Sequence, residues 1–482
     1  MPKLADMRTQ TNFGGNQTWQ SRCYRPASDQ AVLDILERHR DGHLRPVGGK
    51  HSWSDCAASS DVSLDMALFN EVQPYQVGGE NRVRVGAGCT LQAVLDRLHA
   101  QSDQTLPTLG VIKKQTIAGA ISTGTHGSGK PSLSHFVVSV RVAAYDRAGQ
   151  PRIFDYRDGD ELKAGRCGLG CTGVILSVDL RTVPKYHVQE TVVLHGKLEI
   201  VLSRYDEYPL TQFSLIPYRW DYLVFERKEL ARRTLSPAEK FNALCFRLYN
   251  AVWVDRVIHW TVKLGVMAGN GFVKYILLKP APYFFWMRGP RLDDAEQVLT
   301  MGHDLVQHEE MELFVPASRL RELVELLRCI TEVFAGEEKP VPAQIRMKLD
   351  GLGLYDELLQ NRGTYTQHYP YFFRRVLPDD TLISMTSSAE EAYYSVSVFT
   401  YFPPHKREGY YAFCSWLARC MSRLVDARLH WGKHFPLGAA DIARRYPRLE
   451  TFKQLCADTD PKGVFRNAYA ERVLGLPMAP IG

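Results

Sequence analysis

Apolar residues recur at helical spacing in four stretches of the chain. In each stretch they stand three or four residues apart, the period that places side chains on one face of a helix. The stretches are 27–40 with Val32, Leu33, Ile35 and Leu36; 91–99 with Leu91, Val94, Leu95 and Leu98; 320–330 with Leu320, Leu323, Val324, Leu327 and Ile330; and 413–424 with Phe413, Trp416, Leu417, Cys420, Met421 and Leu424. We expect four helices whose apolar faces pack against a core.

Shorter runs rich in β-branched and apolar residues predict strands between these helices. They cover residues 62–66, 82–86, 137–144, 173–183 and 211–216. The first 184 residues, which end at Pro184, therefore form an α+β region, and a second region mixes strands and helices. Within that second region, Ser236-Pro-Ala-Glu239 combines an N-cap serine, a proline at the first helical position and a glutamate two positions later. This pattern predicts the start of a helix.

The composition is typical of a globular protein with more than one domain. The chain has 482 residues, of which 45% are hydrophobic and 23% are charged, so it can bury sizeable cores. A formal net charge of +6 without a lysine or arginine block gives no basis for nucleic-acid binding. The ten cysteines are scattered without metal-ligand spacing, so we expect reduced thiols and no metal. No apolar run reaches the roughly 18 residues of a membrane span, and residues 1–20 lack a signal-peptide core.

Three glycine-rich segments have the spacing of phosphate-binding loops. Residues 124–130 match a P-loop, but Pro131 stands where a hydroxyl residue would bind magnesium. Gly86-Ala-Gly88 matches the start of a dinucleotide-binding turn, but Leu91 takes the place of the third glycine. Both segments favour plain turns. The third segment, Gly48-Gly-Lys-His51, allows the backbone to approach an anionic group, and alone it indicates either a turn or such a site.

Four segments in a fixed order, together with the end of the chain, resemble one family. They are Val47-Gly-Gly-Lys-His-Ser-Trp-Ser-Asp55, Thr116-Ile-Ala-Gly-Ala-Ile-Ser-Thr-Gly-Thr-His-Gly127, Leu169-Gly-Cys-Thr-Gly-Val-Ile175 and His430-Trp-Gly-Lys433, followed by Asp460-Pro-Lys-Gly-Val-Phe-Arg-Asn467. The set resembles the FAD-dependent aldonolactone oxidoreductases and alditol oxidases of the vanillyl-alcohol oxidase superfamily. The resemblance implies an α+β protein with a PCMH-type FAD-binding domain of two α+β subdomains at residues 17–184. It further implies an α+β cap domain for the substrate at 185–424 and a C-terminal segment, 425–482, that returns to complete the FAD site.

The resemblance implies FAD as the cofactor and assigns its contacts. The residues at the matching positions are Val47, Gly48, Gly49, Lys50, His51, Ser52, Gly119, Ser122, Thr123, His126, Gly127, Gly173, Ile175 and Lys433. In relatives, the segment that contains Gly173 and Ile175 commonly holds the adenine. In many relatives a histidine at the place of His51 is bonded covalently to the flavin, so His51 is the candidate for such a link.

The resemblance also assigns the catalytic groups. Family enzymes move a hydride from a C–OH carbon to flavin N5 and carry a Glu-x-Arg pair on a cap strand for charge stabilisation. We match this pair to Gln344 and Arg346, with Lys433 as a second cation and Thr400 as a strand hydroxyl that faces the substrate. Gln344 departs from the family glutamate, and an amide cannot accept the hydroxyl proton. The segment 310–312 carries two glutamates on one side of a strand, which indicates either a catalytic base or a solvated acidic pair.

The resemblance implies an oxidoreductase that acts on a sugar lactone, a polyol or a related alcohol, such as D-arabinono-1,4-lactone, and that passes its electrons to oxygen or a quinone. Two alternatives stay open: a bulkier or lipid-linked substrate met at a membrane surface, and a non-catalytic flavin-binding protein. Residues 241–290 are rich in aromatic and cationic side chains, which indicates either a cap core with a basic rim or a peripheral membrane contact. We expect a cytoplasmic protein, peripheral to the inner membrane face under the first alternative.

Overall fold

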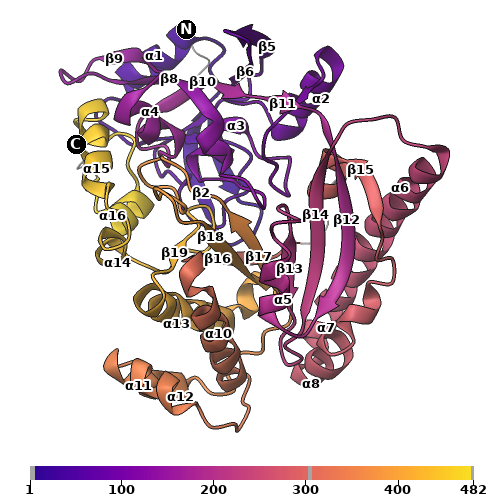
Figure 1. Cartoon of the computed structure of the whole chain (residues 1–482). Coiled ribbons are helices and arrows are strands. Elements are labelled where there is room, and N and C mark those ends of the chain that lie inside the picture. Colours follow the sequence, from indigo (N-terminus) through magenta and orange to yellow (C-terminus); the bar gives the residue numbers. More distant parts are fainter. Residues whose placement is uncertain (1–5, 302–306, 479–482) are drawn as a thin grey trace.

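The computed structural model describes residues 6–301 and 307–478, and its N-terminal region holds two sheets (Figure 1). The first sheet has the strand order β1-β2-β4-β3 and the second the order β5-β6-β10-β8-β9. Their strands are β1 (Asp6–Thr11), β2 (Thr18–Tyr24), β3 (Leu44–Val47), β4 (Val62–Asp65), β5 (Val72–Val77), β6 (Glu80–Gly86), β8 (Val137–Tyr145), β9 (Pro151–Tyr156) and β10 (Val174–Arg181). Two short strands, β7 (Gln104–Thr105) and β11 (Val183–Pro184), form a separate two-stranded sheet.

Helices cover these two sheets, and the predicted apolar stripes form their inner faces. The helices are α1 (Asp29–Arg38), α2 (Leu91–Gln101), α3 (Ile117–Ser122), η1 (Leu133–Phe136) and α4 (Gly159–Arg166). The Ser28 and Thr90 side chains accept hydrogen bonds from the backbone N–H groups of Ala31 and Ala93, both at 3.2 Å, and so cap α1 and α2. Both predicted stripes are buried in one core that the two sheets share, except for the half-buried Leu33, so these predictions are confirmed.

The second region is built on one eight-stranded antiparallel sheet, the cap sheet, with the order β15-β12-β14-β13-β17-β18-β16-β19. Its strands are β12 (Tyr186–His195), β13 (Gln212–Leu215), β14 (Tyr222–Ala231), β15 (Arg291–Asp294), β16 (Glu309–Pro316), β17 (Tyr371–Val376), β18 (Tyr393–Thr400) and β19 (Arg428–Leu429). The sheet unites strands that are far apart in sequence. The predicted α+β class is confirmed, while the domain bounds stay a prediction.

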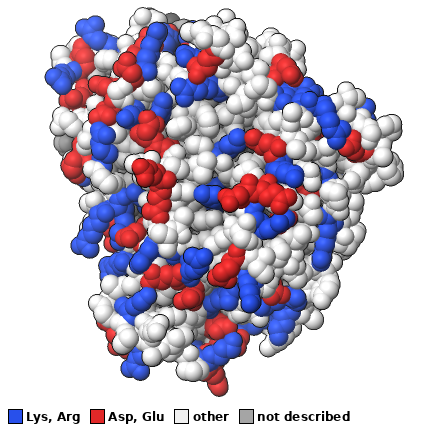
Figure 2. Space-filling model, in the orientation of Figure 1, with Lys and Arg blue, Asp and Glu red and all other residues white. Residues whose placement is uncertain are grey.

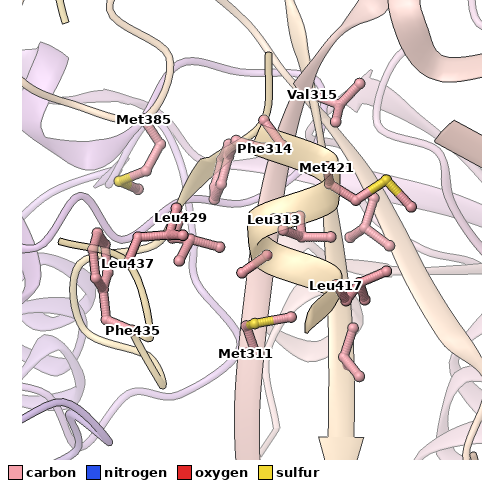
Figure 3. Close-up of a cluster of buried hydrophobic side chains, with 14 of the residues drawn as sticks. Met311, Leu313, Phe314, Val315, Met385, Leu417, Met421, Leu429, Phe435 and Leu437 are labelled. Atoms are coloured by element: carbon pink, nitrogen blue, oxygen red, sulfur yellow. The ribbon is translucent and has the colours of Figure 1, made fainter. Parts of the chain in front are cut away.

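One face of the cap sheet is covered by the two later predicted helices. They are α10 (Leu320–Phe334) and α13 (Glu408–Leu424), and both stripes are buried except for the half-buried Leu424. Figure 3 shows Leu417 and Met421 of α13 among the side chains of Met311, Leu313 and Val315 from β16. Smaller elements nearby are α5 (Leu198–Ser203), η5 (Ala317–Arg319), α11 (Ala343–Gly351), α12 (Tyr355–Gln360) and η6 (Pro404–Lys406).

A long helical rod lies along the other side of the cap sheet, at the right-hand edge of Figure 1. It begins with α6 (Pro237–Tyr249), continues through a π-helical stretch, η2 (Asn250–Ile258), and ends with α7 (His259–Ala268). Its start is the predicted capping box: the Glu239 N–H donates to Ser236 Oγ at 3.3 Å, and the Ser236 N–H donates to Glu239 Oε2 at 2.8 Å. The elements α8 (Asn270–Phe272), η3 (Val273–Leu278), η4 (Ala281–Phe284) and α9 (Ala295–Leu299) follow. No described helix is long and apolar enough to cross a membrane.

The end of the chain returns to the N-terminal region. Helices α14 (Ala439–Ala443), α15 (Leu449–Thr459) and α16 (Ala468–Leu474) follow β19, and Figure 1 shows α15 beside α4. Val464 and Phe465 are buried in the N-terminal core, and the Leu44 N–H donates to the Val464 carbonyl at 2.8 Å. The loop between α15 and α16 is thereby fixed to the N-terminal region.

Candidate active site: a cavity between the two regions

A cavity of about 790 Å³ lies between the N-terminal region and the cap sheet. One wall is made by the backbone-rich segments 47–54 and 110–126 of the N-terminal region. The opposite wall is made by side chains of β16, β17 and β18 and by the inner face of α6 and η2. The segment 430–433 lines the cavity between the two walls. It is held against the N-terminal wall by the backbone N–H of Trp53, which donates a hydrogen bond to the Gly432 carbonyl at 2.8 Å.

The Gly48-Gly49 turn lies against the segment 114–116, and its glycines are required by this close approach. A Cβ atom on Gly49 would stand 2.7 Å from the Lys114 carbonyl oxygen, and one on Gly48 would stand 2.3 Å from Thr116 Oγ1. Lys50 adopts a left-handed φ of 57°, which is uncommon for a residue other than glycine. Of the predicted cofactor contacts, Val47, Gly48, Gly49, Lys50, His51 and Ser52 all line the cavity.

A second segment of small residues lines the same wall. Helix α3 begins after Thr116, whose Oγ1 accepts a hydrogen bond from the Gly119 N–H at 3.3 Å. The predicted residues Gly119, Ser122, Thr123 and His126 line the cavity, as do Gly173 and Ile175. Gly173 has a φ of 118°, and a Cβ there would meet the Ala143 carbonyl oxygen at 2.7 Å, so the chain passes close to β8 at this point.

Gly127 is a correction to the predicted contacts. It lies behind the cavity wall, where a Cβ atom would stand 2.7 Å from the Leu109 carbonyl oxygen. It lines a separate small pocket with Pro107 and Leu109 instead. The close packing of two backbones explains the glycine without a cofactor contact.

The predicted catalytic pair Gln344 and Arg346 also requires correction. Both lie on α11, an outer helix far from the N-terminal region in Figure 1, and both are outside the cavity lining. The Arg346 side chain is 59% exposed; its Nε stands 3.4 Å from the Asp350 carboxylate, and its guanidinium lies 5.0 Å from the centre of the Tyr355 ring. The segment was expected to be a strand, but Ala343, Gln344, Arg346 and their neighbours are good helix formers.

The strand that takes this place is β17. Phe372 and Arg374 point into the cavity, while Tyr371 and Phe373 are buried in the core on the other face, as the alternation of a strand requires. Arg374 Nε donates to the Gln212 side chain at 3.3 Å. Strand β17 therefore presents Phe372 and Arg374, two residues apart, to the cavity on the same side. Strand propensity of Tyr371-Phe-Phe-Arg-Arg-Val376 was the signal that could have found it.

Thr400 is a third correction. It is fully buried on β18, on the face away from the cavity, and its Oγ1 accepts a hydrogen bond from the Phe402 N–H at 3.3 Å. Its neighbours Phe399 and Tyr401 line the cavity instead. With Tyr369 and Phe372 they make the cap side of the cavity strongly aromatic: Tyr369 lies 5.5 Å from Phe399 and 5.2 Å from Tyr401, measured between ring centres.

Lys433 lies in the cavity wall and is held from two sides. Its Nζ forms an ion pair with the Glu310 carboxylate and lies 4.2 Å from the centre of the Trp53 ring. Glu310 and Glu312 both line the cavity from β16, as the spacing predicts, whereas Glu309 is buried on the other side and pairs with Arg407 at 2.7 Å. The structure thus brings a carboxylate and an ammonium group together at one point of the cavity.

A buried polar cluster lies beside this pair. Glu312 Oε1 is 3.3 Å from His126 Nε2, and His430 Nδ1 accepts a hydrogen bond from the Gly432 N–H at 3.0 Å. Burial opposes ionisation of Glu312, yet the nearby His126 ring, followed by Lys433, holds the pKa of Glu312 well below its usual range. Burial lowers the pKa of His430 to about 3, so this ring is neutral. Ligand atoms of His126, Glu312 and His430 lie within 4.8 Å of one another, a cluster that residues so far apart in sequence could not reveal.

The cavity fits FAD. Glycine turns that bring backbone N–H groups to its wall suit a pyrophosphate, and the cations Lys433 and Arg374 suit a ring that gains negative charge on reduction. Gly173 and Ile175, which line the cavity together with Leu169, are the residues that would hold the adenine. These are the residues that would hold the cofactor.

Comparison with known proteins identifies this arrangement. Residues 178–473 match the family model described as D-arabinono-1,4-lactone oxidase, and residues 21–147 match the model of an FAD-binding domain. The chain is 37% identical over 478 residues to a long-chain alcohol oxidase of an uncultured marine euryarchaeote, with 98% of each chain covered. It is 25% identical to L-gulonolactone oxidase of Mus musculus, over 93% of this chain and 94% of the relative.

A solved structure shows the same fold. Cholesterol oxidase from B. sterolicum superposes with a TM-score of 0.73 over 98% of this chain and 97% of that chain, at 15% identity. The predicted family, fold and cofactor are therefore confirmed. The chain belongs to the D-arabinono-1,4-lactone oxidase family, and it is an FAD-dependent oxidoreductase of the PCMH-type fold that acts on CH–OH donors.

Proposed function

We propose that this enzyme oxidises the C–OH group of a large, mostly apolar alcohol in preference to a sugar lactone. The observation that carries this proposal is Phe372, which lines the cavity two residues before Arg374. We match these two residues to the family's Glu-x-Arg pair, so that phenylalanine takes the place of the glutamate. A lactone or polyol presents several hydroxyl groups, and each one buried without a partner costs free energy. The aromatic wall of Tyr369, Phe399 and Tyr401 favours a hydrocarbon chain instead.

The relatives support the same choice. The long-chain alcohol oxidase is 37% identical to this chain, and the gulonolactone oxidase is 25% identical.

Bound FAD would supply the acceptor for the hydride that leaves the alcohol carbon. The chain's own residues would supply the rest. Glu310 is placed to accept the hydroxyl proton, because its carboxylate lines the cavity and lies beside Lys433. Lys433 and Arg374 would stabilise the negative charge that develops during the reaction. The aromatic wall would exclude water and orient the chain of the substrate.

The covalent link is a separate part of the proposal. His51 lines the cavity directly after the Gly48-Gly49 turn, and its ring centre lies 5.3 Å from that of Phe13. We propose that His51 carries the flavin. Acid precipitation of the wild-type protein should leave the yellow colour in the pellet, and the His51→Ala variant should release it to the supernatant. Colour that stays in the pellet of the variant would show that another residue forms the link.

We also propose that the enzyme works at a membrane face, in contact with it through residues 241–290. The proposal is supported by the aromatic and cationic residues of this segment, which borders the cavity through Phe246, Tyr249 and Phe285. A substrate with a long hydrocarbon chain partitions into membranes, so an enzyme that oxidises it meets a higher substrate concentration at the membrane surface.

Turnover with a panel of substrates tests the proposed reaction. Long-chain primary alcohols should be converted to aldehydes at least about tenfold more efficiently than galactono-, gulono- or arabinonolactone. Oxygen consumption and quinone reduction are measured in the same assays, so that the electron acceptor is identified with the substrate. Efficient turnover of a lactone without turnover of any long-chain alcohol would contradict the proposal.

A further inference from the structure

The helical rod α6–η2–α7 is apolar on both of its sides, which is unusual for a helix at a protein surface. Its inner side packs against the cap sheet with Ala243, Phe246, Tyr249, Val262 and Val266. Its outer side is lined by large apolar side chains that are exposed by between 38% and 74%. These are Phe241, Leu244, Leu248, Val252, Val257, Trp260, Leu264 and Met267. They follow one another at three to five residues, so they form one continuous stripe.

The segment that follows the rod extends this apolar surface. Phe272, Tyr275, Ile276, Tyr283 and Trp286 are exposed by 38–69%. We call the outer stripe of the rod together with these five residues the apolar outer face. A contiguous exposed apolar surface of this extent marks a place of contact with another apolar phase or molecule.

Cationic side chains accompany the apolar outer face. Lys263 Nζ lies 5.1 Å from the centre of the Trp260 ring, and Lys279 Nζ lies 4.4 Å from the centre of the Tyr275 ring. Lys240 and Arg256 are exposed on the same rod. Lysine and arginine beside tryptophan and tyrosine are the combination found at the headgroup level of membranes.

The two acidic residues of the rod have interactions or positions apart from the apolar outer face. Glu239 forms the capping box with Ser236 and pairs with Arg233. Asp255 lines the cavity on the inner side. The apolar outer face therefore combines hydrocarbon with positive charge. A second copy of the chain would bring positive charges against one another, whereas an anionic lipid surface complements them.

The same rod also forms a wall of the cavity. Asn250, Ala251 and Val254 of η2 line it from the inner side, and Phe285 and Met287 continue this lining. The wall of the cavity and the apolar outer face are thus two sides of one helical layer. Figure 2 shows acidic and basic side chains interspersed over the face it presents.

We infer that the apolar outer face docks on the surface of an anionic lipid bilayer, and that the alcohol enters the cavity from the bilayer past η2 and the segment 285–287. This inference rests on the proposed oxidation of an apolar alcohol. The rod lies along the membrane surface and does not span it, in agreement with the lack of a spanning helix among the described residues. Docking shortens the path of the substrate, which never has to cross water.

Vesicle binding and vesicle turnover test the inference with the FAD-loaded full chain. The variant is Leu264→Glu/Met267→Glu, since both side chains are more than 60% exposed on the outer stripe and lie outside the cavity lining. The matched control is Met347→Glu, which is 67% exposed on α11, away from the rod. Flavin absorbance verifies that each variant is folded and loaded.

The wild type and the control should sediment with vesicles that contain phosphatidylglycerol, and binding to pure phosphatidylcholine vesicles should be weaker. The double variant should lose on the order of tenfold in binding to the anionic vesicles. Its turnover of a long-chain alcohol embedded in those vesicles should fall in parallel, while its turnover of a short, water-soluble alcohol stays at the wild-type level. Added salt should weaken the binding of the wild type.

Three results would overturn the inference: a wild type that stays in the supernatant with anionic vesicles, a double variant that binds like the wild type, or a wild-type dimer that the double variant converts to a monomer. Failure of the proposed function is distinguishable from these. A different result would be that no alcohol is oxidised in any assay, while the wild type binds vesicles and the double variant does not. The docking of the apolar outer face would then be confirmed, and the proposal that an alcohol enters from the bilayer would be wrong.

Discussion

The two walls of the cavity are built in different ways. The N-terminal wall consists of local segments in which glycines and short side chains bring the backbone itself to the cavity, as at Gly48 and Gly49. The cap wall consists of large side chains from strands far apart in the chain, such as Phe372 and Phe399. The first wall has to fit one invariant cofactor with its backbone. A change of side chain in the cap wall can change the substrate that the enzyme accepts, because the sheet that carries these side chains stays the same.

The largest expected effect comes from the charged residue between the two walls. Lys433→Met should lower the rate of flavin reduction by about 100-fold, because a preorganised positive charge is lost and Glu310 loses its partner. Stopped-flow absorbance under anaerobic conditions measures this rate. Lys453→Met, on the distant helix α15, serves as the control. An unchanged rate in Lys433→Met would mean that the charge at the junction of the walls does not assist the reaction.

Phe372→Glu tests the cap wall directly. It introduces a carboxylate beside Arg374, so the ratio of kcat/KM for a long-chain alcohol to that for a polyol or lactone should fall by roughly 10- to 100-fold. Gln344→Glu is the matched control, and it should change neither value because Gln344 lies on the outer helix α11. The opposite result, a new lactone activity from Gln344→Glu alone, would restore the assignment that the structure corrects.

Gly49→Ala tests the N-terminal wall. The added Cβ would stand 2.7 Å from the Lys114 carbonyl oxygen, so the turn has to move and the purified enzyme should carry several-fold less FAD. The ratio of flavin to protein after purification measures the loss. Gly196→Ala is the control, since no atom lies within 4 Å of the Cβ it would add. Equal flavin content in both variants would show that the close approach at Gly49 is dispensable.

The smallest expected effect concerns an ion pair that joins the two regions. Asp380, in the loop after β17, accepts a hydrogen bond from Arg166 of α4 at 2.8 Å. The His135 ring, whose Nδ1 lies 3.7 Å from the carboxylate, together with Arg166, lowers the pKa of Asp380 from 3.8 to about 2. The folded state therefore favours the ionised form, so the stability is present above pH 3.8 and is lost as the pH falls toward about 2.

Asp380→Asn should lower the free energy of unfolding at neutral pH by less than about 1 kcal/mol, since Asp380 is 53% exposed. Denaturant titrations at several pH values measure it. The difference between wild type and variant should shrink as the pH falls through this window. A difference that is constant with pH would contradict the assignment to the ionised carboxylate.

The N-terminal wall could be predicted from the sequence, because its residues lie in continuous motifs and their backbone conformation is dictated locally. The helices with a clear apolar stripe could be predicted for the same reason. The cap wall could not, since Phe372 is brought to Phe399 and Glu310 by strand pairing over long distances in the chain. The Glu-x-Arg pattern points instead to Gln344 and Arg346, whose helix-forming neighbours place them on α11. The alternation of one buried and one cavity-facing residue around Arg374 becomes visible only when the sheet is known.

The central claim is that the aromatic cap wall selects an apolar alcohol, and anaerobic bleaching of the bound flavin tests it most directly. Mixing the wild-type enzyme with a series of primary alcohols should bleach the visible flavin absorbance, and the rate at a fixed concentration should rise with chain length. L-Gulono-1,4-lactone should bleach it slowly or not at all. Rapid bleaching by the lactone, with no response to any alcohol of the series, would contradict the account.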